Sequence, residues 1–145
     1  MQITNIFYLQ ENGDNMNVKV NSPIISKMVY ITFRKEGIHK YPEASYEKSL
    51  ESVKFLGLEH RHLFYFKIWI SVDHLNRDIE FIQFKRWLLS LYSENILVMN
   101  DQSCEMMAEQ LYHMINLKYP NRTVFIDISE DNENGCYMQW FSHLE

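Results

Sequence analysis

The stretch that decides the fold reads His60-Arg61-His62-Leu63-Phe64-Tyr65-Phe66-Lys67-Ile68-Trp69-Ile70-Ser71-Val72. From Leu63 onward, every even-numbered position carries an apolar side chain, and this strict alternation predicts a long β-strand over residues 63–72 with one face in the core. Extending the same register backward places His60 and His62 on the Phe64 side, at the start of the strand. Both imidazoles therefore point the same way.

A histidine pair of this kind is typical of metal sites. Two neutral imidazoles, a third protein ligand and one open position are what a catalytic zinc centre requires. His39 follows a β-type run, so a neighbouring strand can bring it to the pair. We predict a Zn²⁺ site made of His39, His60 and His62. The alternative is that the pair are simply polar residues at a strand entrance, because isolated His-x-His pairs are common.

The composition limits the class of protein. The chain has 145 residues with 46% hydrophobic content, which predicts a single domain over residues 1–145. A net charge of −5 argues against nucleic acid as a partner. The absence of a long apolar run or a leader-like start argues against a membrane partner. The two cysteines, Cys104 and Cys136, fit a reducing compartment, so we expect a cytoplasmic protein.

The first half of the chain contains one further strand pattern. Residues 1–22 carry a turn signal at Asn12–Asn15 and predict either an extra strand or a mobile arm. Residues 27–33 are rich in β-branched and aromatic types and predict the first core strand, with Val29, Ile31 and Phe33 on one face. Residues 34–59 predict a long excursion between strands, and long loops of this kind are often functional.

The second half predicts two helices and a hairpin. Apolar spacing predicts a helix over about residues 82–93, and Ser103 is the expected cap of a second helix. Residues 123–128 and 136–141 alternate as strands, with Asn134-Gly135 as the turn between them. The apolar stripe expected on the second helix is Met107, Ala108, Leu111, Met114 and Ile115. These elements predict an α+β fold, an antiparallel four-stranded sheet with two helices packed on one face, in the order ββααββ.

These elements and their residues resemble the 6-pyruvoyl-tetrahydropterin and 6-carboxy-tetrahydropterin synthases of the T-fold, or tunnelling fold. The resemblance covers about residues 27–140. The matching positions are Phe33 and His39 in the first strand region, His60 and His62, Glu80-Phe81 with Phe84-Lys85, Ser103-Cys104-Glu105, and Glu130. Five such segments occur in the family's order.

The resemblance implies an activity and an assembly. It implies a zinc protein that eliminates triphosphate from dihydroneopterin triphosphate or a related pterin. Glu130 would anchor the ring, and Cys104 and Glu105 would lie beside it. Arg61 departs from the family, which has Gly within its His-x-His, and as a cation near the site it is a candidate to meet a phosphate. Subunits would join edge to edge into a homo-oligomer, a trimer or a hexamer.

Two catalytic positions of that family are missing. The family has a cysteine shortly before its His-x-His, and residues 51–58 contain none. It also has an Asp-His pair between its helices, and residues 92–100 contain no histidine. Cys104 is the remaining thiol candidate, because a thiol near a helix N-terminus can have a lowered pKa. The alternatives are therefore an enzyme of this type, a non-catalytic T-fold protein that binds or sequesters a pterin- or purine-like ligand, and a structural module whose histidines are incidental.

Overall fold

The computed structural model describes residues 6–11, 14–19 and 26–142, and it is an α+β protein. The elements follow the chain in this order: β1 (Ile6–Glu11), β2 (Asp14–Lys19), β3 (Met28–His39), the 3₁₀ segments η1 (Pro42–Ser45) and η2 (Lys48–Gly57), β4 (His60–Ser71), α1 (Phe81–Leu91), β5 (Ile96–Asn100), α2 (Cys104–Lys118), β6 (Val124–Glu130) and β7 (Asn134–Trp140).

The main sheet is mixed and has five strands, in the order β5-β3-β4-β6-β7. The antiparallel pairs are β3–β4, β4–β6 and β6–β7, whereas β5 runs parallel to β3. The predicted four-stranded antiparallel sheet is therefore wrong in strand number and in one pairing. The missed strand, Ile96–Asn100, buries only Leu97 and Met99 in its five residues, too short an alternation to be recognised in sequence.

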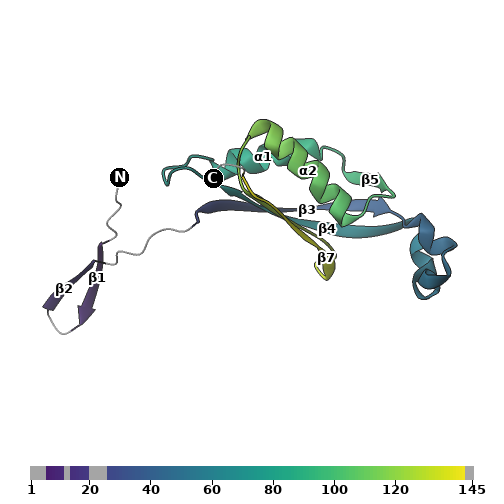
Figure 1. The fold of residues 1–145 in the computed structure, drawn as a ribbon, viewed down its shortest axis with the longest axis horizontal. Coiled ribbons are helices and arrows are strands. Elements are labelled where there is room, and N and C mark those ends of the chain that lie inside the picture. The colour runs from purple at the N-terminus through teal and green to yellow at the C-terminus, as the bar shows by residue number, and fades with distance from the viewer. Residues whose placement is uncertain (1–5, 12–13, 20–25, 143–145) are drawn as a thin grey trace.

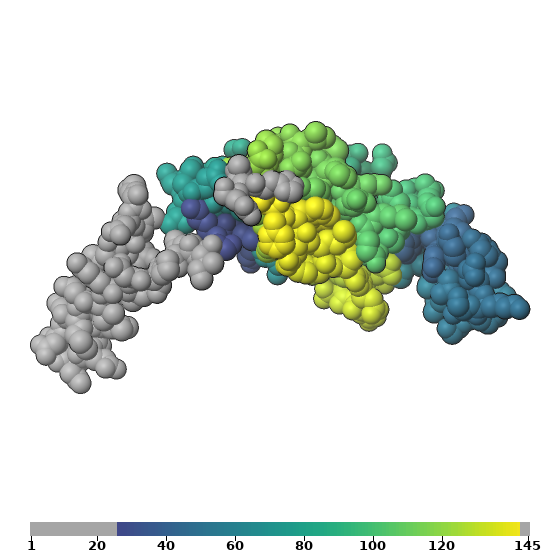
Figure 2. All heavy atoms as spheres, in the orientation of Figure 1, coloured from purple at the N-terminus to yellow at the C-terminus, as the bar shows by residue number. Residues whose placement is uncertain are grey.

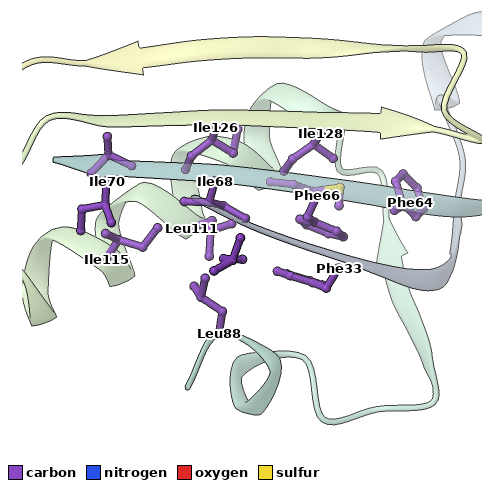
Figure 3. Packing of buried hydrophobic residues seen from close by; sticks show 14 of the residues in the cluster. Phe33, Phe64, Phe66, Ile68, Ile70, Leu88, Leu111, Ile115, Ile126 and Ile128 are labelled. Atoms are coloured by element: carbon purple, nitrogen blue, oxygen red, sulfur yellow. The ribbon is translucent and has the colours of Figure 1, made fainter. Parts of the chain in front are cut away.

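The core lies between one face of this sheet and the two α-helices. Figure 1 shows α1 and α2 over the same face, as predicted. The alternation in β4 is confirmed, because Phe64, Phe66, Ile68 and Ile70 are all buried. Figure 3 shows these side chains pointing toward Leu88 of α1 and Leu111 and Ile115 of α2. Each such buried side chain contributes about 1.5–3 kcal/mol, so this layer fixes which face of β4 packs against the helices.

The helix starts follow from capping. The Glu80 carboxylate accepts hydrogen bonds from the backbone N–H groups of Ile82 and Gln83, so α1 begins one residue earlier than predicted and ends at Leu91. Ser103 Oγ accepts from the Met106 N–H at 3.3 Å, which confirms the predicted cap of α2.

One member of the predicted apolar stripe of α2 is not in the core. Met107, Ala108, Leu111 and Ile115 are buried, but Met114 is 43% exposed. At about 100° per residue, the other four span an arc of about 100° around the helix, and Met114 falls about 20° outside it, next to Met107. The expectation that all five residues pack in the core is wrong for this one.

The β6–β7 hairpin is present, but its turn lies earlier than predicted. Asn134 already pairs with Glu130, so Asn134 and Gly135 belong to β7. The turn residues Asp131 and Asn132 have φ values of 53° and 60°. Asp and Asn tolerate this left-handed conformation better than other non-glycine residues, so they form the turn in place of the Asn-Gly pair.

The amino-terminal prediction is met in part. β1 and β2 pair in antiparallel register from Ile6 opposite Lys19 to Glu11 opposite Asp14. The rest of the predicted arm, residues 1–5, 12–13 and 20–22, lies outside the described residues. Across the part of the chain that the structure describes, no helix has the length and apolarity needed to span a membrane.

Candidate metal centre

The sheet register brings the three predicted histidines together. His39 is the last residue of β3 and pairs directly with His60, the first residue of β4. His62 lies two positions further along β4, on the same face. The ring centroids are 4.7 Å apart for His39 and His60, 5.2 Å for His39 and His62, and 5.0 Å for His60 and His62. One nitrogen from each ring lies within 4.8 Å of the others, so a single ion can contact all three.

Each of these imidazoles has an acceptor on its Nδ1 atom. The contacts are His39 Nδ1 to the Gln102 carbonyl at 3.0 Å, His60 Nδ1 to the Leu58 carbonyl at 2.7 Å, and His62 Nδ1 to Asp131 Oδ2 at 2.6 Å. A carbonyl or carboxylate oxygen only accepts, so these contacts assign the proton to Nδ1. In a neutral ring, the lone pair is then on Nε2. Metal-binding histidines use this arrangement, with an outer acceptor that fixes the tautomer and the ring orientation.

Two of the three Nε2 atoms are buried without a hydrogen-bond partner. His39 Nε2 and His62 Nε2 are the buried side-chain nitrogen or oxygen atoms that lack a hydrogen-bond partner among the described residues. His39 as a whole is only 8% exposed. An unpartnered buried polar atom costs about 1–3 kcal/mol, so two in one cluster require an explanation. A metal ion bound by nitrogen ligands supplies one, and the residues present therefore fit zinc.

Glu130 lies against the same cluster. It is the last residue of β6 and pairs with Phe64, two residues after His62. Its Oε1 atom is 3.2 Å from His39 Nε2, and its Oε2 atom is 3.5 Å from His62 Nε2. The residue that the resemblance assigns to a ring ligand is thus directed at the three-histidine cluster.

A cavity of about 260 Å³ opens beside the histidines. Its walls come from the end of β3, the end of η2, the start of β4, the start of α2 and the ends of β6 and β7 that flank their turn. Figure 2 shows the lobe that contains η1 and η2 protruding at this end of the molecule. Its lining includes His39, His60, Cys104, Glu105 and Glu130. A larger cavity of about 760 Å³ between β3 and α1 contains none of these residues.

Arg61 does not join the cluster. Neighbouring residues in a strand point to opposite faces, so Arg61 projects away from His60 and His62. Its guanidinium lies 3.4 Å from the Glu36 carboxylate, and about half of the side chain is exposed. The structure therefore brings together all the predicted site residues except Arg61.

Cys104 does not have the lowered pKa expected at a helix N-terminus. Burial, reinforced by the negative charge of Glu130, raises the pKa of the Cys104 thiol to about 12. The Sγ atom lies 4.0 Å from Glu130 Oε1, to which the S–H group donates. The thiol is therefore protonated at neutral pH, and the lowered pKa expected from its place at a helix start is not found.

Sequence reasoning missed Asp131 as part of the site. Its two carboxylate oxygens contact His62 Nδ1 at 2.6 Å and the Leu63 N–H at 2.9 Å. The hydrogen bond with His62, followed by that from Leu63, lowers the pKa of Asp131. The available signal was the acidic run at residues 130–133, whereas the carbonyl partners at Leu58 and Gln102 have no sequence signal.

Comparison with known proteins gives no identification, because no family model matches the chain and a search of curated proteins finds no match. What the fold and the site define is an α+β protein with a three-histidine cluster at one end of its sheet.

Proposed function

We propose that this chain is a zinc protein of the tetrahydropterin synthase type that binds a pterin- or purine-like ring beside its metal centre. The observation that carries the proposal is the set of three imidazoles whose Nδ1 atoms all have acceptors. This leaves three Nε2 lone pairs on one cluster, two of them buried without a hydrogen-bond partner. Zinc held there would act as a Lewis acid toward a bound hydroxyl or carbonyl group.

The adjoining cavity supports a small ring as the ligand. Its volume of about 260 Å³ is slightly below the roughly 300 Å³ at which sites for drug-sized ligands begin, so a fused bicyclic ring matches it better than a ring with a long tail. Carboxylates at Glu105 and Glu130 can accept hydrogen bonds from the amidine-like edge of a pterin or guanine.

A second candidate function is elimination of triphosphate from dihydroneopterin triphosphate. Its support is the three-histidine ligand set, which is typical of catalytic zinc sites. Elimination also needs proton transfer, which typically supplies ~10²–10⁴-fold in rate. Burial raises the pKa of Cys104, the one thiol lining the described cavity, which disfavours it as the base of this reaction. Ring binding with weak turnover is therefore the function we favour.

Calorimetry and an activity assay together test this proposal. Zinc-loaded protein is titrated with neopterin and with guanine, and phosphate release from dihydroneopterin triphosphate is measured in parallel. We expect saturable binding of one ring per chain and turnover at least 100-fold below that of a complete synthase. Cys104→Ala should leave the residual turnover unchanged, with Cys136→Ala as the matched control. No binding of either ring would overturn the ring proposal, and brisk turnover lost only in Cys104→Ala would favour the enzyme.

The proposal includes assembly of subunits through the sheet edges. β5 pairs with β3 only from Glu36 onward, so the outer edge of residues 28–35 has no strand partner among the described residues. β7 is the opposite edge of the sheet. Unpaired edges are templates for pairing with another chain. We expect a trimer or hexamer by light scattering at micromolar concentration, and a strictly monomeric mass would contradict this assembly.

A further inference from the structure

We infer that Glu130 is a fourth protein ligand of the metal, so that the centre is closed by three imidazoles and one carboxylate before any ligand binds. This inference rests on the metal centre proposed above and changes its chemistry. The resemblance assigns Glu130 to the ring and leaves the fourth metal position open.

The Glu130 carboxylate lies at ligand spacing from two of the three histidines, whereas the ligand atoms that all lie within 4.8 Å of one another are those of the histidines themselves. Zinc binds histidine nitrogen at about 2.0–2.1 Å and carboxylate oxygen at about 2.0–2.2 Å, and tetrahedral geometry then separates neighbouring ligand atoms by roughly 3.3–3.5 Å. Glu130 Oε1 is 3.2 Å from His39 Nε2, and Glu130 Oε2 is 3.5 Å from His62 Nε2. The carboxylate is thus spaced from two imidazole nitrogens as a ligand that shares their ion would be.

The charges point to the same conclusion. Because the Nδ1 atoms of His39 and His62 face acceptors, their Nε2 atoms carry lone pairs in the neutral rings. Each lone pair then faces a carboxylate oxygen, and two acceptors at this distance repel each other unless a proton on the ring or a metal cation lies between them. His39 Nε2 and His62 Nε2 are buried and have no hydrogen-bond partner among the described residues, so solvent does not relieve the repulsion. One divalent ion satisfies all three acceptors together.

The backbone around Glu130 is fixed to the strand that carries the histidines. Glu130 pairs with Phe64 on β4, and the next residue, Asp131, donates its N–H to the Leu63 carbonyl at 2.9 Å. The Asp131 carboxylate in turn accepts from His62 Nδ1. One β6–β7 turn therefore supplies both a direct ligand and the outer partner of a second ligand, which is how precise metal sites are supported.

A closed centre has a functional consequence. Sites with four protein ligands are usually structural, whereas catalytic sites keep one position for water or substrate. A ligand that reaches the metal here must first displace the Glu130 carboxylate. Glu130 would therefore control access to the metal. A ring that hydrogen-bonds to the Glu130 carboxylate would draw it away from the metal and free a coordination position at the same time.

Azide titration of the Co²⁺-loaded protein tests this inference without relying on activity. Azide replaces a metal-bound water and shifts the visible cobalt bands, but it competes poorly with a protein carboxylate. We expect little spectral change in the wild type and a clear, saturable change in Glu130→Ala and Glu130→Gln. Glu133→Gln, which removes an exposed carboxylate of the neighbouring turn, should behave like the wild type.

Zinc affinity, measured by competition with a chromophoric chelator, gives a second readout. Glu130→Gln should weaken binding by at least the 10- to 100-fold that loss of an outer-shell partner typically costs. Urea unfolding of the metal-free variants checks that they fold. An azide response in the wild type equal to that of Glu130→Ala, or unchanged affinity in Glu130→Gln, would overturn the role of Glu130 and leave the three-histidine centre standing. Failure of the wild type to bind either metal would overturn both.

Discussion

The two ends of β4 both hold clusters of polar side chains, but the clusters differ in how their atoms are satisfied. At the Ser71 end, Arg122 contacts Asp73 at 2.9 Å, Asp78 at 2.7 Å and the Ser71 carbonyl at 3.2 Å. Donors face acceptors throughout. At the His60 end, the Nδ1 atoms have acceptors, but the Nε2 atoms of His39 and His62 face the Glu130 carboxylate and are buried without a hydrogen-bond partner among the described residues.

This difference separates a structural cluster from a binding site. The hydrogen-bonding groups of the Arg122 cluster are paired with one another. The cluster therefore ties the segment after β4 to the start of β6 without an added ligand. In our proposal, the histidine cluster is completed by a metal cation. The same strand thus ends in two polar groups with opposite requirements, and substitutions at each end should have different effects.

The largest expected effect is on metal binding. His62→Ala removes one of three imidazoles and should abolish stoichiometric zinc binding, measured by calorimetry. Arg122→Ala, at the other end of β4, should lower stability but leave one zinc per chain. Equal loss of zinc in both variants would show that metal binding reports general folding rather than this site.

Zinc itself should stabilise the protein. A ligand that binds only the folded state adds about 2.7 kcal/mol at a concentration 100 times its dissociation constant. We expect urea unfolding of the wild type to shift by about this amount on zinc addition and to return on chelation. The His62→Ala variant should show no such shift, and an unchanged wild-type transition would contradict the proposal.

The Asp131 contact should matter less than a direct ligand. Asp131→Asn keeps the shape but weakens the acceptor that orients His62, and loss of such a partner typically costs 10–100-fold in metal affinity. Glu133→Gln in the same turn is the matched control, because Glu133 is exposed. Equal affinities in the two variants would show that Asp131 does not orient the ligand.

The smallest effect is expected at the self-satisfied end. Asp78→Asn should lower the free energy of unfolding by about 1–2 kcal/mol at neutral pH, since hydrogen bonds to charged groups contribute on this scale. The Asp73 N–H, with help from Arg122, lowers the pKa of Asp78. Its contribution is therefore complete above its unfolded pKa, near 3.9, and is lost as pH falls through the lower folded value. The difference between wild type and variant should shrink in acid, and a constant difference down to pH 2 would contradict this assignment.

Much of the fold was predictable because buried apolar residues recur with the period of the strand or helix that contains them. The alternation from Phe64 to Ile70 fixed the face and register of β4, and with it the common direction of His60 and His62. The five-residue β5 was not predictable, because two buried positions do not make a recognisable period. The early hairpin turn was missed because Asp131 and Asn132 adopt the conformation usually taken by glycine.

The site was predictable only where a side chain carries its own chemistry. His39, His60 and His62 stood out by residue type and spacing, whereas the acceptors that orient two of them are backbone carbonyls at Leu58 and Gln102. The direction of Arg61 was predictable from the sequence, because residues next to each other in a strand point to opposite faces. The raised pKa of Cys104 depends on burial, which its position at a helix start did not reveal.

The most direct test of the central claim is the metal content of the purified protein. Wild-type chain is first purified without chelator, then stripped of metal and reloaded with zinc. Its zinc content is measured by plasma mass spectrometry beside that of the His60→Ala/His62→Ala double variant. We predict about one zinc per chain in the wild type and none retained by the double variant. Full occupancy in the double variant, or no zinc in the reloaded wild type, would contradict the metal centre.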